Sequence, residues 1–126
     1  MKKYAFAGAG GRATTMFAVP LAKEYGDVAQ IVGVFDPNRK RCEALAKRTE
    51  TEIPLYTDFD TMLEETKPDV VIVATVDRYH HEYIVRALHA GCDVISEKPL
   101  TIDDEKCRAI LKAQEQTGKK VTVTFN

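Results

Sequence analysis

A glycine-rich loop close to the N-terminus is the first group of residues whose types and spacing point to chemistry. It reads Gly8-Ala9-Gly10-Gly11-Arg12-Ala13 and stands between an apolar run and a helical apolar pattern. In this setting Gly8 would make a tight turn, Gly10 would let the backbone approach a pyrophosphate, and Ala13 would let the helix pack on its strand. The helix N-terminus and Arg12 would attract the phosphate oxygens. On its own, the pattern fits a dinucleotide site and a turn kept for packing about equally well.

Asp36 adds a second element to that pattern, because it ends the next apolar run, VAQIVGVF. A carboxylate there can accept hydrogen bonds from both ribose hydroxyls of NAD and would repel a 2′-phosphate, which favours NAD over NADP. Two alternatives stay open. Asp36 can instead cap the helix that follows it, and the basic run Arg39-Lys40-Arg41 can bind a 2′-phosphate, so NADP is also a candidate cofactor.

Two further candidate segments lie at the C-terminal end of the fourth predicted strand and directly after the fifth, at the edge of a parallel sheet where ligands bind. The small residues Ala74 and Thr75 would leave room for a cofactor. Lys98, in the loop SEKPL, would lie near the reacting end of a dinucleotide, where it can hydrogen-bond a substrate hydroxyl and assist proton transfer. The alternative for Glu97 and Lys98 is a pair of solvent-exposed charges.

The strands that must position these residues follow from short apolar runs. They are predicted at 4–7, 28–35, 53–58, 69–76, 93–96 and 120–125. Helical patterns lie between them, so strands and helices alternate along the chain. This order is typical of a parallel sheet with helices on both faces. We therefore predict an α/β domain with a doubly wound, six-stranded parallel sheet of the Rossmann type, in the order 3-2-1-4-5-6, over residues 1–126.

Helix starts are assigned from capping patterns. Pro37 is expected to open the helix after the second strand. Thr57 and Asp60 are expected to form a capping box for the next helix. In the last helix, Ile110 and Leu111 are expected to face inward.

Composition and charge narrow the classes of partner and compartment. Hydrophobic residues make up 44% of the chain, charged residues 29%, and the net charge is -1, which gives no electrostatic reason to expect nucleic acid or a membrane as partner. The 3 cysteines include no C-x-x-C pair, and the adjacent His80 and His81 point in different directions on a helix, so we expect neither a disulfide frame nor a metal site. A cytoplasmic protein without a signal peptide or membrane span is expected.

Several motifs together carry a resemblance to a known family: AGAGGRA, Asp36, VIVATVDRYHHEYIVRALHAGCDVISEKPL and the final VTFN. They resemble the N-terminal domain of the Gfo/Idh/MocA oxidoreductases, and the resemblance covers essentially the whole chain. The stretch from Ala90 to Leu100 is its most specific part.

The resemblance implies an NAD(P)-binding Rossmann domain at 1–126, cut from a longer protein whose second domain binds a sugar or cyclitol and drives homo-oligomerisation. Lys98 matches the family's active-site lysine, which contacts substrate and nicotinamide. Glu97 matches the residue near the nicotinamide ribose. Thr75 and His80 match an A-T-P-x-x-x-H segment that lines the cofactor groove, although Val76 replaces its proline here.

The expected function is the cofactor half of an NAD(P)-dependent dehydrogenase that transfers hydride between nicotinamide and a sugar, cyclitol or related polyol. We expect residues 1–126 alone to bind NAD(H) with little or no turnover. A non-catalytic NAD(H)-sensing module and an NAD-dependent glycosidase remain alternatives. The identity of the substrate does not follow from the sequence.

Overall fold

Six parallel strands form one sheet in the order β3-β2-β1-β4-β5-β6. The computed structural model describes residues 2–9, 18, 23, 26, 28–50, 52–74, 80–97 and 104–124. The strands are β1 (Lys2–Ala7), β2 (Ala29–Phe35), β3 (Leu55–Tyr56), β4 (Val70–Val73), β5 (Asp93–Glu97) and β6 (Val121–Thr124). The predicted fold class and strand order are confirmed.

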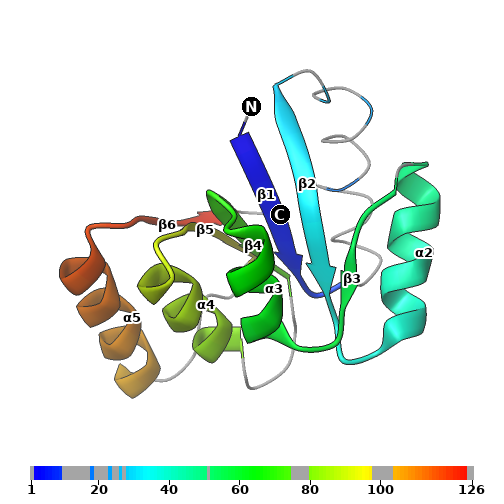
Figure 1. Ribbon diagram of the computed structural model, residues 1–126. Coiled ribbons are helices and arrows are strands. Elements are labelled where there is room, and N and C mark those ends of the chain that lie inside the picture. The colour runs from blue at the N-terminus through cyan, green and yellow to red at the C-terminus, as the bar shows by residue number, and fades with distance from the viewer. Residues whose placement is uncertain are drawn as a thin grey trace.

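Helices cover both faces of this sheet. They are α2 (Arg39–Thr49), α3 (Phe59–Thr66), α4 (His80–His89) and α5 (Asp104–Thr117). Helices α3, α4 and α5 lie side by side in Figure 1, and their core includes Ala5, Ala7 and Val71 of the sheet. Helix α2 packs on the other face, where its Leu45 joins Phe6. Alternate residues of β1 and β4 therefore enter different layers, as expected for a strand buried on both sides.

A β-bulge interrupts the alternation on β2. Tyr4 pairs with Ile31 and Ala5 pairs with Gly33, so Val32 is an extra residue on β2. Val32 packs against the α3–α5 core, and a Cβ on Gly33 would meet Met62 of α3 at 3.1 Å, so two consecutive residues face the same layer. Beyond the bulge Ala7 pairs with Phe35, so the residues after β1 and β2 emerge side by side.

Two helix starts differ from the predicted ones. Helix α2 begins at Arg39, and its N-cap is Asn38, whose side chain accepts from the Lys40 N–H at 3.0 Å. Pro37 therefore precedes the cap. Helix α3 is capped by Asp58, which accepts from the Thr61 N–H at 2.9 Å, and not by Thr57. Aspartate and asparagine at these positions outcompete the neighbouring candidates because their side-chain oxygens reach the free amides of the first turn.

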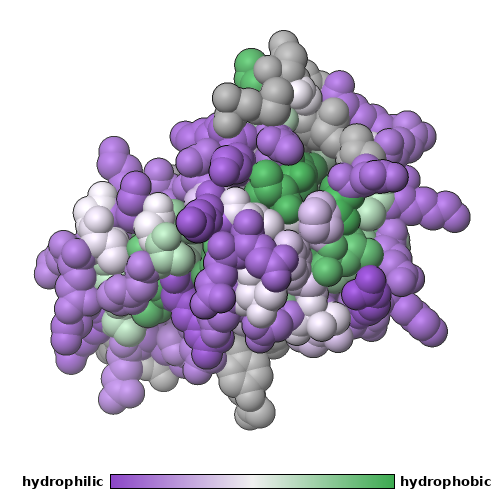
Figure 2. Space-filling model, viewed as in Figure 1, coloured by the Kyte–Doolittle hydropathy of each residue, from purple (hydrophilic) through white to green (hydrophobic). Residues whose placement is uncertain are grey.

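The prediction that Leu111 of α5 faces inward is also wrong, because Leu111 is 58% exposed, whereas Ile110 is buried. Isolated apolar residues of this kind are common on protein surfaces. Figure 2 shows that hydrophilic side chains cover most of the viewed face, with hydrophobic residues gathered over β2. Among the described residues, no helix has both the length and the apolar character to cross a membrane.

Aspartate side chains join neighbouring strands at the edge of the sheet where the strands begin. Asp69, just before β4, accepts a hydrogen bond from the Lys3 N–H of β1 at 2.7 Å. Asp93, the first residue of β5, accepts from the Lys120 N–H before β6 at 3.0 Å. Each carboxylate thus fixes the start of the adjacent strand.

Candidate functional site

Three segments meet at the opposite edge, where the strands end. Strands β2, β1 and β4 are neighbours in the sheet, and Asp36, Gly8 and Ala74 directly follow them. The Gly8 N–H donates to the Phe35 carbonyl at 2.8 Å, and the Ala74 N–H donates to the Ala7 carbonyl at 2.8 Å. These bonds extend the ladders by one residue and hold the ends of the three strands together at the point where the strand order reverses.

Gly8, which directly follows β1, has a backbone conformation that favours glycine. Its φ is 105°, a conformation that residues with a Cβ rarely adopt, and the residue is buried. This φ gives a physical reason for a glycine at the first position of the glycine-rich loop.

Asp36 is the buried charged side chain of this region, with only 6% of its surface exposed. Its Oδ2 accepts from the Ala9 N–H at 3.0 Å, and its Oδ1 accepts from the Asn38 N–H at 2.8 Å. A carboxylate offers about four acceptor positions, and donors from the described residues use two of them. The side chain thus faces the start of the glycine-rich loop.

The thiol of Cys42 is buried close to Asp36. The Cys42 Sγ of α2 lies 3.9 Å from the carbonyl oxygens of Val34 and Asp36. Burial, and then the charge of Asp36, raise the pKa of the Cys42 thiol to about 11. The thiol is therefore protonated and unreactive at neutral pH, and its role is packing.

An aromatic cluster supports the same edge. The rings of Phe35, Phe59 and Tyr83 meet edge to face, with centroid separations of 5.5, 5.4 and 5.0 Å. Phe35 immediately precedes Asp36, Phe59 begins α3, and Tyr83 lies in α4. The cluster therefore fixes the end of β2 relative to the helices that follow β3 and β4.

The other predicted site residues are only partly described. The backbone of His80 begins α4, and the backbone of Glu97 ends β5, one residue beyond the pairing of Ser96 with Val73. The remaining predicted site residues lie outside the described residues: Gly10, Gly11, Arg12, Ala13, Thr75 and Lys98. Of the predicted set, the structure thus brings together Gly8, Asp36 and Ala74.

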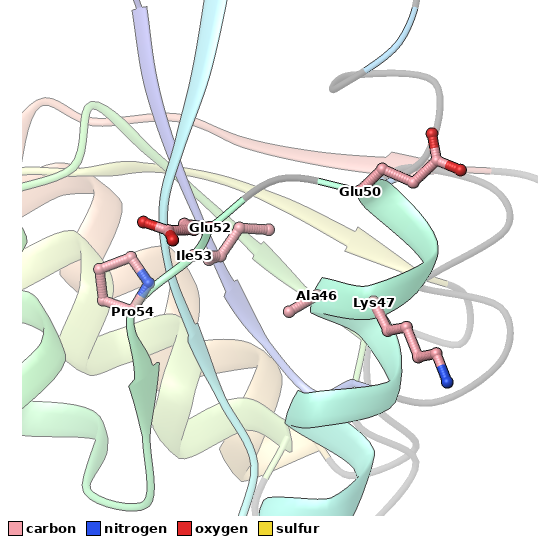
Figure 3. Close-up of a pocket in the computed structure, with 6 residues that line it drawn as sticks. All are labelled: Ala46, Lys47, Glu50, Glu52, Ile53 and Pro54. Carbon is pink, nitrogen blue, oxygen red and sulfur yellow. The ribbon is translucent and has the colours of Figure 1, made fainter.

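Two of the cavities that described residues line are found at the other edge of the sheet. The larger one, of about 760 Å³, lies between the end of α2 and the segment before β3. Figure 3 shows its Ala46 and Ile53 side chains pointing toward one another, whereas Lys47 and Glu50 extend away. The smaller one, of about 440 Å³, lies between the ends of α3 and α4. Neither has Gly8, Asp36 or Ala74 in its described lining, and the described residues contain no cluster of three potential metal ligands.

Comparison with known proteins decides what kind of domain carries this geometry. The model of the oxidoreductase family with an NAD-binding Rossmann fold matches residues 2–125. The chain belongs to the Gfo/Idh/MocA oxidoreductase family. It is thus an NAD-binding Rossmann domain of that family, as the sequence motifs indicated.

Two curated relatives give the extent of the similarity. YteT of Bacillus subtilis (strain 168) is 36% identical over 130 residues, which cover 100% of this chain and 30% of YteT. The D-glucoside 3-dehydrogenase of Escherichia coli (strain K12) is 33% identical over 97 residues, which cover 77% of this chain and 27% of that enzyme. The chain therefore spans about a third or less of the length of these relatives.

A solved dehydrogenase structure has the same fold. It is the WlbA dehydrogenase of Chromobacterium violaceum in complex with NADH and UDP-GlcNAcA, with a TM-score of 0.86 and 25% identity. The match covers 98% of this chain and 34% of WlbA.

Sequence reasoning missed the partners of the Asp36 carboxylate. The bond from the Asn38 N–H had a signal, because Asp-Pro-Asn is typical of a turn in which an aspartate accepts a hydrogen bond from the amide two residues on. The bond from the Ala9 N–H had no signal in the sequence. It joins the residues that follow β1 and β2, and the relative register of these strands depends on the bulge at Val32.

Proposed function

We propose that this domain binds NAD(H) across the ends of β2, β1 and β4, and that the full-length protein transfers hydride between the nicotinamide and a sugar or related polyol. The observation that carries the proposal is the Asp36 carboxylate, buried and directed at the start of the glycine-rich loop. The family match supports the cofactor, and a D-glucoside dehydrogenase among the relatives supports the substrate class.

The residues present fit such a cofactor. The acceptor positions of Asp36 that the described residues leave unused suit the adjacent hydroxyls of the adenosine ribose. The same carboxylate would repel a 2′-phosphate, which favours NAD. Arg39, Lys40 and Arg41 are exposed in the first turn of α2, close to Asp36 in the sequence, and leave NADP as the second candidate.

Roles for the remaining residues follow from their order along the chain. When bound, the nicotinamide ring would supply the hydride acceptor or donor. In this proposal the amides of Gly10 and Gly11, with Arg12, hold the pyrophosphate, and Ala13 lets the helix approach. Ala74, Thr75, His80 and Glu97 line the groove toward the nicotinamide. Lys98 binds the substrate hydroxyl and assists the transfer of its proton.

A thermal-shift titration of the domain with NADH and NADPH tests the cofactor. A ligand at about 100 times its Kd adds about 2.7 kcal/mol of stability. We expect NADH to raise Tm and NADPH to raise it less at equal concentration. No rise with either ligand would contradict the proposal, and a larger rise with NADPH would reverse the choice of cofactor.

In the full-length protein, Lys98→Ala tests the catalytic part. We expect turnover of sugars or polyols to fall about 100-fold or more, as for loss of a proton-transfer group. The Kd for NADH should change little. Equal losses in turnover and in NADH affinity would assign Lys98 to cofactor binding instead.

A further inference from the structure

We propose that Asp36 is a positioning residue as well as a ribose acceptor: its carboxylate fixes the start of the glycine-rich loop before any cofactor arrives. The inference rests on the proposed function, because it concerns how the same site is prepared for NAD(H). It goes further in assigning Asp36 a task that does not involve the ribose hydroxyls.

The contact between Asp36 and Ala9 is the basis of this role. The Ala9 N–H donates to Asp36 Oδ2 at 3.0 Å, across 27 residues of sequence. Ala9 is 4% exposed and Asp36 is 6% exposed, so solvent is largely excluded from the bond. Removal of the carboxylate would leave a buried N–H without an acceptor, which is more costly than loss of an exposed bond.

Asp36 is itself held from two sides, so it gives the loop a fixed reference. Its Oδ1 accepts from the Asn38 N–H at 2.8 Å, and its own N–H donates to the Tyr56 carbonyl at 3.2 Å. Strand β2, which ends at Phe35, pairs with both β1 and β3. The carboxylate therefore transmits the position of the sheet to Ala9, directly before Gly10 and Gly11.

Two roles for Asp36 predict different results for a cofactor that lacks the hydroxyls. If Asp36 only binds the adenosine ribose, then its removal should not affect an NADH analogue without the 2′- and 3′-hydroxyls of that ribose. If Asp36 also positions the loop, the analogue should lose affinity too, because each binding event must then order the loop.

The experiment measures Kd by calorimetry for NADH and for its 2′,3′-dideoxyadenosine analogue. We expect Asp36→Ala to weaken binding of the analogue by about tenfold or more, the range for a lost hydrogen bond to a charged group. An unchanged Kd for the analogue would overturn the proposal. The matched control is Asn38→Ala, which removes the α2 cap but keeps the backbone N–H that bonds Asp36. An equal loss in this control would also overturn the proposal.

Hydrogen exchange of the Ala9 amide in the cofactor-free protein gives a second readout. We expect a protected amide in the wild type and fast exchange in Asp36→Ala or, should that variant not fold, in Asp36→Leu, whose side chain also has no acceptor. Fast exchange in the folded wild type would overturn the proposal, whatever the cofactor measurements show. A wild type with a protected Ala9 amide but without affinity for NADH would instead contradict the proposed function alone.

Discussion

Gly8 is the residue whose backbone most directly depends on having no side chain. A Cβ at a φ of 105° is strained, at a cost of about 1–3 kcal/mol. The same position begins the loop that we propose to bind the pyrophosphate. Stability and cofactor affinity should therefore both depend on this glycine.

We expect Gly8→Ala to lower the free energy of unfolding by about 1–3 kcal/mol and to weaken NADH binding, as measured by urea denaturation and calorimetry. Gly91 offers a matched control, because it has a φ of 89° at the end of α4, and a Cβ added there would meet no other heavy atom within 4 Å. Gly91→Ala should destabilise the fold similarly and leave the Kd for NADH unchanged. Equal effects of the two variants on Kd would show that Gly8 acts through stability alone.

Residue types indicated which positions to expect in the site, but they did not indicate the contacts between those positions. Gly8 and Asp36 were singled out because a tight turn and a strand-end carboxylate are each tied to one or two residue types. The Ala9 N–H has no such signature, since every residue other than proline has a backbone amide. Its partner became visible only with the packing of β1 on β2.

At the scale of single elements, the strand starts are fixed by side chains. Asp69 binds the Lys3 N–H of β1, and Asp93 binds the Lys120 N–H before β6. Asp69 precedes β4, which pairs with β1, and Asp93 begins β5, which pairs with β6. Each hydrogen bond therefore reinforces a register that the backbone ladder already sets.

We expect Asp69→Ala to lower the free energy of unfolding by about 1 kcal/mol, the usual contribution of one hydrogen bond. Glu43→Ala is the control, because among the described residues it removes an exposed pair with Arg39 of α2, with 3.7 Å between Oε1 and Nε. That change should cost less than about 0.5 kcal/mol in the same urea titration. A loss for Asp69→Ala no larger than the control would show that the ladder alone fixes β1.

The existence of these elements could be predicted from the sequence more reliably than the residues at which they begin. Apolar runs are long enough to mark strands, but adjacent polar residues compete for each cap. Asp58 and Thr57 are both good caps, and only the geometry of the first turn selects Asp58. Leu111 was misplaced because Ile110 and Ala113 occupy the buried side of α5, and Leu111 lies on the exposed side.

At the scale of the whole molecule, two buried thiols make the free energy of unfolding fall at alkaline pH. Burial, as the largest cause, raises the pKa of both Cys42 and Cys92 from 9.0 to about 11. In the unfolded chain these thiols ionise near 9.0, while in the folded protein they stay protonated. Between about pH 9 and 11 the folded state therefore binds more protons, and stability falls as pH rises.

We expect the free energy of unfolding of the wild type to fall from about pH 8 to about pH 10.5. The fall should be smaller in the double variant Cys42→Ala, Cys92→Ala, because this variant lacks the two thiols. Lysine and tyrosine titration is common to both proteins and does not contribute to the difference between them. Urea denaturation at the two pH values measures the difference. Equal falls in the two proteins would show that the thiols ionise in the folded state as readily as in the unfolded chain.

The strand order of the sheet was predictable because three constraints leave few possible topologies. They are the alternation of strands and helices, the right-handed crossover between parallel strands and the number of strands. The bulge at Val32 was not predictable, because an extra residue in a buried strand leaves the apolar run unbroken. It nevertheless decides that Asp36 emerges beside Gly8.

The central place of β1 also shapes how the protein is made. Tyr4 pairs with Val70, so 70 − 4 = 66 residues separate the two partners. At roughly 5–20 residues per second, a ribosome needs about 3–13 seconds to add that length. During this interval the apolar nascent strand has no neighbour on its β4 side, which makes it a natural target for chaperones acting on growing chains.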